Sequence, residues 1–208
     1  LGAFALQHNI FIVADDIYSR LIYHGNTFSS MVMTTPEIRE NCLIVTGVSK
    51  TYAMTGWRIG FAFGPEKLIK AMGNLQSHTT SNPTTVSQYA ALEALLGKQE
   101  NAFEMQDEFA KRLDKAYNLV KELPGFSLEK PQGAFYLFPK VTEAMKLCQV
   151  TDVDEFVSLL LEETGVAVVS GRSFGDSQAI RISYAVHEEV FQEAMERILA
   201  FLQNKRLK

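Results

Sequence analysis

Short apolar runs alternate with longer amphipathic stretches along the first half of the chain. Apolar runs bounded by polar residues are typical of buried strands, whereas apolar residues three and four apart are typical of helices. Strands are therefore expected at Ile10–Ala14, Leu43–Thr46 and Ile59–Phe63. Helices are expected at Glu66–Gln76, Val86–Leu96 and, over the longest stretch, Phe103–Leu123. Because the first run is apolar at every position, we expect its strand to be buried on both faces of an α/β sheet.

The pattern changes to shorter elements after Pro124-Gly125, which ends the longest helical stretch. Strands are expected at Phe126–Leu128, Ala134–Phe138, Val166–Val169 and Ala179–Ala185. Helices are expected at Val153–Glu163 and Val190–Leu202. The sequence therefore predicts a smaller α+β region after the long helix, and we expect the aromatic residues of 134–138 to be structural.

The composition is that of a globular chain with a modest negative charge. Of its 208 residues 47% are hydrophobic, and the formal net charge is -4. The basic residues form no long stripe that would indicate nucleic acid, and no apolar run approaches the roughly 20 residues that cross a bilayer. Cys42 and Cys148 form no CxxC pair, and the four histidines lack ligand spacing. These features argue against a metal site and fit a reducing cytoplasm.

Candidate chemistry occurs where two of the expected strands end. Lys50 lies in the segment Gly47–Trp57, between the second and third expected strands. Asp15 and Tyr18 follow the first expected strand, and ligands of α/β sheets bind at the carboxyl ends of strands. From the residues alone, Lys50 could equally be a solvated surface charge, Asp15 a helix cap and Tyr18 a surface aromatic residue.

An arginine interrupts the last predicted strand. Arg181 lies in the middle of the apolar run Ala179–Ala185. A buried guanidinium must find an anion, whereas an arginine on an edge strand can remain in water. Both interpretations stay open at this point.

Three motifs together resemble the class I and II aminotransferases, which are fold-type I pyridoxal phosphate enzymes. The motifs are Ser49-Lys50 followed by Thr55-Gly56-Trp57-Arg58-Ile59-Gly60-Phe61, Asp15-x-x-Tyr18, and Arg181-x-Ser183-Tyr184-Ala185. The resemblance covers essentially the whole chain and is closest to bacterial aspartate aminotransferases. It implies the second half of that α/β fold: part of a mostly parallel sheet with flanking helices, a long interdomain helix and a small α+β domain. The corresponding ranges are 1–100, 101–123 and 124–208.

The resemblance implies a role for each motif residue. Lys50 carries the cofactor, pyridoxal 5'-phosphate, as a Schiff base and also transfers protons. Asp15 pairs with the pyridine nitrogen of the cofactor, and Tyr18 pairs with its phenolic oxygen. Arg58 binds the phosphate and Arg181 binds the α-carboxylate of the substrate, since a planar guanidinium can make two parallel hydrogen bonds to such anions.

The chain departs from the family's pattern at Gly47, where many members carry a phosphate-binding serine. Ser49 is the expected replacement for that hydroxyl. The loop Ser77–Thr85 is implied to lie at a dimer interface, with Thr79 and Ser81 near the neighbouring subunit's cofactor phosphate. The expected partner is therefore a second copy of the protein, in a homodimer with a shared active site.

The chain is also expected to be a fragment. Leu1–Gln7 is apolar at helical spacing, with neither an initiator Met nor an N-cap before it. The family's first half, which supplies further cofactor contacts, does not occur in the sequence. The isolated chain is therefore expected to bind pyridoxal phosphate weakly and to be inactive as an enzyme.

The resemblance implies an enzyme that moves an amino group between an amino acid, with aspartate favoured, and a 2-oxo acid such as 2-oxoglutarate. Two alternatives remain. A C-S β-lyase of the same fold would keep Lys50, Asp15 and Arg181. A non-catalytic module similar to an aminotransferase would bind the cofactor in order to regulate or to dimerise.

Overall fold

The computed structural model describes residues 1–206 and divides the chain into two compact units within helix α4 (Glu100–Lys121). We call residues 1–106 the N-terminal unit and the described residues from 107 onward the C-terminal unit. Helix α4 occupies almost the whole stretch that the sequence predicts as a long helix. No helix in the described part of the chain is long and apolar enough to cross a membrane.

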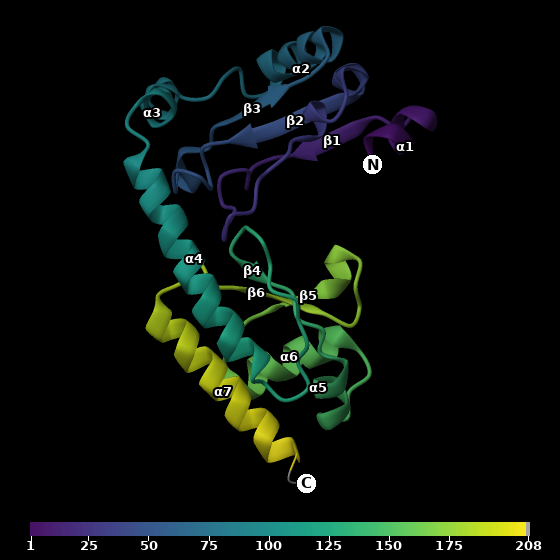
Figure 1. Ribbon diagram of the computed structural model, residues 1–208, viewed down its shortest axis with the longest axis vertical. Helices are drawn as coiled ribbons and strands as arrows, with labels where there is room; N and C mark the ends of the chain where they lie inside the picture. The colour runs from purple at the N-terminus through teal and green to yellow at the C-terminus, as the bar shows by residue number, and fades with distance from the viewer. Residues whose placement is uncertain (207–208) are drawn as a thin grey trace. The chain divides into compact units, whose positions relative to one another are not determined.

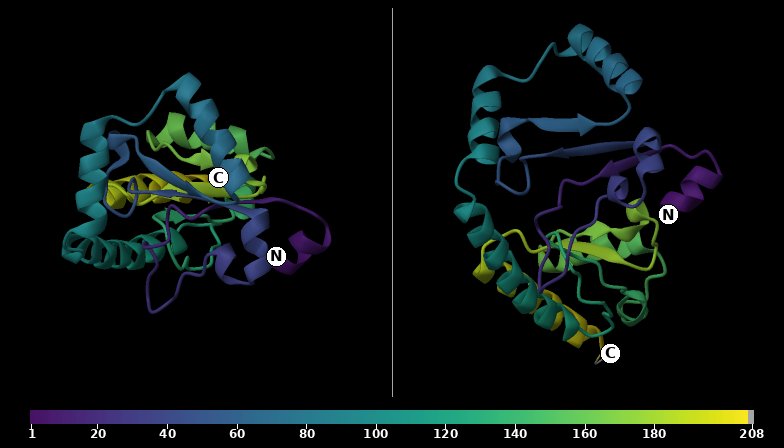
Figure 2. Two further views of the ribbon diagram at one scale, coloured as in Figure 1. Left: turned by 90° about the horizontal axis from the view of Figure 1, so that it is seen from above. Right: turned by 45° about the horizontal axis from the view of Figure 1, so that its top comes forward.

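The N-terminal unit contains a sheet in the order β1-β2-β3, made of β1 (Ile12–Asp15), β2 (Cys42–Gly47) and β3 (Gly60–Phe63). β1 and β2 run parallel, with Asp15 opposite Val45. β2 and β3 run antiparallel, with Gly47 opposite Gly60. The strands lie side by side (Figures 1 and 2), and the arrowheads of β1 and β2 point to the same edge (Figure 1). The second and third predicted strands are thus confirmed almost at their predicted bounds.

The first strand differs from its prediction in position and in burial. β1 begins only at Ile12, so Ile10 and Phe11 precede it. The Val13 side chain is 65% exposed, and the expectation of burial on both faces was therefore wrong. The physical reason is that no described element covers the face of β1 that bears Val13. An apolar run shows that a strand can be covered, but not that a neighbouring element covers it.

Helices α1 (Gly2–Gln7), α2 (Glu66–Thr79) and α3 (Thr85–Leu96) and the 3-10 turns η1 (Met31–Met33), η2 (Pro36–Asn41) and η3 (Thr55–Trp57) complete this unit. Helix α2 extends into the segment predicted as a loop from Ser77. The Thr79 hydroxyl donates to the carbonyls of Leu75 and Gln76 in the same helix, each at 3.2 Å. Thr79 is therefore bonded within its own helix in this structure.

Helix α3 has apolar residues on all sides. Only Ser87 and Ala91 are buried in it. Its exposed large apolar side chains are Val86, Tyr89, Leu92, Leu95 and Leu96. A helix that is apolar all round is typical of a fully covered environment.

The C-terminal unit contains a second sheet in the order β4-β6-β5, made of β4 (Tyr136–Leu137), β6 (Ile180–Ser183) and β5 (Val169–Ser170). Both pairings are antiparallel. The helical elements are α5 (Thr142–Leu147), α6 (Val153–Thr164), the 3-10 turn η4 (Gly171–Phe174) and α7 (Glu188–Arg206). The strands are shorter than predicted: β5 starts at the end of the run 166–169, and the run 126–128 forms only a bridge from Ser127 to Lys140.

The core of the C-terminal unit is well filled. Large side chains that are fully buried there are Leu113, Leu137, Phe156, Leu160, Ile180, Ile198 and Leu202. Helix α6 contributes two of them because its apolar residues repeat at helical spacing. Asp152 caps its N-terminus, and the Asp152 carboxylate accepts hydrogen bonds from the N–H groups of Asp154 and Glu155. Gly165 caps its C-terminus in the left-handed conformation that favours glycine (φ 69°).

Candidate functional site

The C-terminal edge of the first sheet gathers most of the predicted site residues. Asp15 is the last residue of β1 and Gly47 is the last residue of β2. Parallel pairing places both at the same edge of the sheet, from which the chain continues into loops (Figure 1). The predicted site residues at this edge are Asp15, Tyr18, Ser49, Lys50 and Arg58. The remaining one, Arg181, belongs to the C-terminal unit.

Lys50 lies close to Tyr18. The ammonium nitrogen of Lys50 is 5.8 Å from the centre of the Tyr18 ring. We call the segment Gly47–Trp57, which carries Lys50, the lysine loop. Buried neighbours of Lys50 hold this loop in place, since Val48 is fully buried and Thr51 is 5% exposed. The hydroxyl of Tyr52 also donates to the side chain of Gln99 at 2.8 Å. The structure therefore presents a half-buried amine on an anchored loop, beside a phenol.

Two adjacent carboxylates at the end of β1 have different surroundings. The Asp16 carboxylate accepts a hydrogen bond from the Ser30 hydroxyl at 2.6 Å, and the backbone N–H of Asp16 donates to the Val45 carbonyl at 2.8 Å. Asp15 is exposed, and its carboxylate accepts from the Ile17 N–H at 3.2 Å. Asp16 thus fixes the loop, and Asp15 is the carboxylate that a ligand can reach. Within residues 1–206 no group of three or more His, Cys, Asp or Glu side chains could hold a metal ion.

Arg58 has an unusual backbone conformation. It follows η3 in the left-handed region, with φ 51° and ψ 51°. For a residue other than glycine this conformation costs about 1 kcal/mol or more, and such strain is often found at functional sites. The exposed guanidinium donates to the Thr55 carbonyl at 2.8 Å. Ser49 is half-buried and directly precedes Lys50 in the chain.

The backbone around Gly47 leaves little room for a side chain. A Cβ atom at Gly47 would lie 3.0 Å from Gly60 Cα and 3.0 Å from the Ile59 carbonyl oxygen. A side chain at this position would therefore fit only if the neighbouring backbone gave way by a few tenths of an ångström. The close approach of β2 and β3 thus favours glycine here.

Arg181 lies in the middle strand of the second sheet. β6 pairs with β4 on one side and with β5 on the other, so the alternative of an arginine on an edge strand was wrong. Its guanidinium carbon is 4.5 Å from the ring centre of Tyr136 and 4.3 Å from that of Phe174. Neither ring is predicted from the sequence motifs to lie beside Arg181. The alternation along β4, which puts Tyr136 and buried Leu137 on opposite faces, is the only signal that could have found the first.

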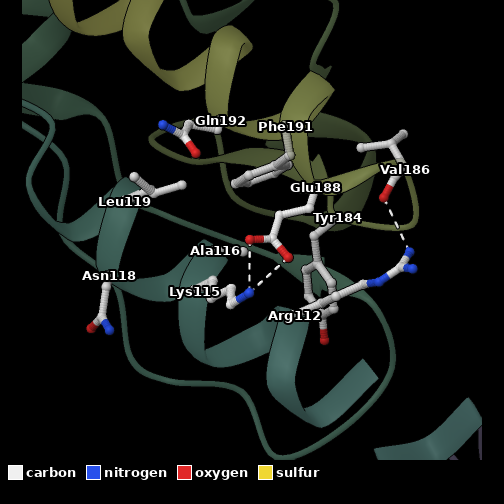
Figure 3. Close-up of a pocket in the computed structure, with 10 residues that line it drawn as sticks. All are labelled: Arg112, Lys115, Ala116, Asn118, Leu119, Tyr184, Val186, Glu188, Phe191 and Gln192. Carbon is white, nitrogen blue, oxygen red and sulfur yellow. Dashed lines mark hydrogen bonds and ion pairs between the residues drawn. The ribbon is translucent and has the colours of Figure 1, made fainter. Parts of the chain in front are cut away.

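A cavity of about 300 Å³ lies between α4 and α7 in the C-terminal unit (Figure 3). Its charged groups already bind one another. Lys115 donates to both carboxylate oxygens of Glu188, at 2.7 and 2.8 Å, and Arg112 donates to the Val186 carbonyl at 3.1 Å. The remaining wall is largely apolar, from residues such as Leu119 and Phe191. We assign no ligand to this cavity because the charged groups that line it already have partners within the protein.

Comparison with known proteins identifies relatives along almost the entire chain. The model of the family described as "Aminotransferase class I and II" matches residues 1–198. The aspartate aminotransferase of Bacillus subtilis is 48% identical over 203 residues, which are 98% of this chain and 52% of the relative. The asparagine--oxo-acid transaminase of Streptococcus mutans is 47% identical over equal shares. The chain thus spans about half the length of the curated relatives that it matches.

Solved structures agree with these relatives in fold. The aromatic aminotransferase of Pyrococcus horikoshii superimposes with a TM-score of 0.91 at 34% identity, over 100% of this chain and 55% of that structure. The aspartate aminotransferase of Rhizobium meliloti gives 0.88 at 38% identity, over 97% of this chain and 52% of that structure. The expected α/β fold, the second half of a pyridoxal phosphate-dependent transferase, is confirmed.

Proposed function

The chain belongs to the class I and II aminotransferase family, and we propose that the whole protein moves an amino group between an amino acid and a 2-oxo acid. Aspartate is the proposed amino acid and 2-oxoglutarate the proposed 2-oxo acid. Similarity to several aspartate aminotransferases supports the first choice. The observation that carries the proposal is the position of Lys50 beside Tyr18, at the sheet edge where β1 ends with Asp15.

The side chains at this edge fit pyridoxal phosphate, the cofactor of this family. The fit rests on their chemistry: an amine for the aldehyde, a phenol for the phenolic oxygen, a carboxylate for the pyridine nitrogen and a guanidinium for the phosphate. The residues that would hold these groups are Lys50, Tyr18, Asp15 and Arg58. When bound, the cofactor supplies an acceptor for the electrons released at the substrate's α-carbon.

Each side chain has a separate task in this proposal. Lys50 would hold the cofactor covalently in the resting protein; once the substrate amine has displaced it, its freed amine would remove and return the proton at the substrate Cα. The ionised Asp15 carboxylate holds a proton on the ring nitrogen, because the opposite charge favours the protonated form. The Tyr18 hydroxyl donates a hydrogen bond to the phenolic oxygen.

The two arginines are proposed to bind anions. Arg58, together with the Ser49 hydroxyl, binds the cofactor phosphate, and Arg181 binds the α-carboxylate of the substrate. A guanidinium suits both because its donors form a rigid fork that matches a carboxylate or a phosphate. The exposed position of Arg58 and the absence of an ion pair to Arg181 among the described residues support these roles.

We also propose the domain arrangement and assembly that the family implies. Residues 1–100 form the second half of the large cofactor-binding domain, 101–123 the interdomain helix and 124–208 the small domain. The division of the chain within α4 supports this arrangement. The exposed apolar surface of α3 supports a homodimer, and the free thiols of Cys42 and Cys148 are compatible with a cytoplasmic location.

A direct assay tests this function. The full-length protein, loaded with pyridoxal phosphate, is expected to convert aspartate and 2-oxoglutarate into oxaloacetate and glutamate with ping-pong kinetics, because the amine is carried between two half-reactions. Release of ammonia and pyruvate from a β-substituted amino acid, without amino-group transfer, would favour the C-S lyase instead. Cofactor binding without either reaction would favour a regulatory module. The isolated 208-residue chain is expected to be inactive in the same assay.

A further inference from the structure

The surroundings of Arg181 differ from those of the other arginines described in the C-terminal unit. Arg112 pairs with Glu108 at 2.8 Å, Arg197 pairs with Glu193, and Arg172 pairs with two aspartates. Among the described residues no carboxylate pairs with Arg181 and no hydrogen bond joins its guanidinium to the protein. Its guanidinium carbon instead lies 4.5 Å from the ring centre of Tyr136 and 4.3 Å from that of Phe174. We call these two residues the aromatic clamp.

The register of the second sheet places the first ring of the clamp. Tyr136 on β4 lies opposite Ser183 on β6, two residues from Arg181 and hence on the same face of that strand. A diagonal neighbour at this spacing lies within reach of long side chains. Tyr136 is thereby placed beside the guanidinium by backbone pairing, independently of any ligand.

A tight turn places the second ring. Phe174 ends η4, directly before Gly175, which has a φ of 84°. The turn begins at Gly171, whose N–H donates to the Ala179 carbonyl at 2.8 Å. A Cβ atom at Gly171 would lie only 2.4 Å from that carbonyl oxygen, so the turn tolerates no side chain there. Phe174 is 48% exposed, and its contact with Arg181 is therefore not a requirement of core packing.

The two contacts restrict the guanidinium without consuming its donors. Both contacts are cation–π contacts and not hydrogen bonds. The N–H donors of the guanidinium therefore remain available to an anion. Cation–π contacts of this kind stabilise one orientation of a side chain that otherwise has many rotamers. Binding of an anion then costs less conformational entropy, because the side chain is already ordered.

We propose that Tyr136 and Phe174 are positioning residues that hold the Arg181 guanidinium ready for the carboxylate of the amino-acid substrate. This inference rests on the proposed function, in which Arg181 binds that carboxylate. The aromatic clamp takes the place that a carboxylate occupies beside Arg112, Arg172 and Arg197. A protein carboxylate at Arg181 would compete with the substrate, and aromatic rings do not.

Steady-state kinetics of the full-length protein test the inference. Tyr136→Leu and Phe174→Leu are each expected to raise the KM for the amino acid about fivefold, with kcat changed less than about twofold, since one cation–π contact is lost. Tyr136→Phe and Phe174→Tyr keep the rings and should retain the wild-type KM. Phe201→Leu is the matched control, because it removes a ring 5.2 Å from the ammonium of Lys205 on α7. An unchanged KM in both leucine variants would overturn the inference.

Two further measurements separate this inference from the proposed function. Arg181→Lys should lower kcat/KM more than either ring variant; if it has no effect, the carboxylate role of Arg181 fails. If it has a large effect while the leucine variants have none, only the aromatic clamp fails.

In the 208-residue chain, the NMR signals of the Arg181 δ protons should be shifted upfield by the rings, and the shift should be reduced in Phe174→Leu. Its absence from the wild type overturns the aromatic clamp even if the protein has no activity.

Discussion

The two units of the chain differ in how far their apolar residues are buried. In the N-terminal unit, Val13 on the sheet is 65% exposed and Val86 on α3 is 70% exposed. In the C-terminal unit, Phe156 and Leu160 on α6 are fully buried. The predicted cofactor-binding residues belong to the first of these units, and Arg181 belongs to the second. The predicted cofactor-binding residues therefore lie in a unit that leaves apolar surface uncovered.

This difference shows that local order does not require a closed core. The lysine loop keeps its position through a small cluster of buried residues, Val48, Met54, Ile59 and Ala91. These residues anchor the loop although the nearby sheet and α3 remain exposed. A large exposed apolar area normally marks a surface that another protein surface covers. The N-terminal unit thus combines an anchored loop, which carries the predicted site residues, with apolar surface that is exposed in this structure.

The strongest test of the anchored site is replacement of the lysine. Lys50→Ala is expected to reduce amino-group transfer by the full-length protein at least about a thousandfold, because a proton-transferring base is lost. The melting temperature should remain close to that of the wild type, since the anchors beside Lys50 are unchanged. Borohydride reduction followed by mass spectrometry should show cofactor fixed to the wild type and not to the variant.

Lys98→Ala is the matched control for this test. Lys98 is an exposed lysine of the same unit, and its removal should leave both the activity and the borohydride adduct unchanged. Equal labelling of Lys50→Ala and the wild type would show that another lysine carries the cofactor.

The difference in burial itself predicts different sensitivities to truncation. Phe156→Ala should destabilise the 208-residue chain by about 3 to 5 kcal/mol, because it leaves a cavity in a closed core. Val13→Ala should change the free energy of unfolding by less than about 0.5 kcal/mol, as expected for an exposed side chain. Urea unfolding measures both values. Similar losses in the two variants would show that the face of β1 bearing Val13 is covered in solution.

The elements of the fold that depend on local sequence could be predicted. β2, β3 and α4 occur almost at their predicted bounds, because apolar periodicity reports them directly. The exposure of Val13 could not be predicted, since it depends on whether another element covers the sheet. In the candidate site, too, some features could be predicted from the local sequence and others could not. The motif identified Lys50, whereas the contact of Tyr136 with Arg181 depends on strand register across 45 residues of chain.

The Gly47 position offers an intermediate effect. Gly47→Ser restores the hydroxyl found in many family members, but its Cβ would meet Gly60 Cα and the Ile59 carbonyl oxygen at 3.0 Å. We expect a loss of about 1 to 3 kcal/mol in unfolding free energy. Gly56→Ser is the control, because a Cβ atom there has no neighbour within 4 Å. A stable Gly47→Ser variant would mean that β2 and β3 can separate at this end without cost.

The smallest expected effect is a dependence of stability on pH in the C-terminal unit. Hydrogen bonds from the N–H of Asp154, and then from that of Glu155, together with nearby Arg172, lower the pKa of Asp152 below its ordinary value of 3.8. A carboxyl group with a lowered pKa in the folded state stabilises the protein above its unfolded pKa, and this contribution is lost as the pH falls through the folded pKa.

Asp152→Asn should therefore be slightly less stable than the wild type at pH 6, and the difference should shrink between about pH 4 and pH 2. Glu162→Gln, on the exposed side of the same helix, is the matched control for removing one negative charge. Chemical unfolding of the three proteins across this pH range gives the comparison, and a difference for Asp152→Asn that grows on acidification would contradict the assigned direction of the pKa shift.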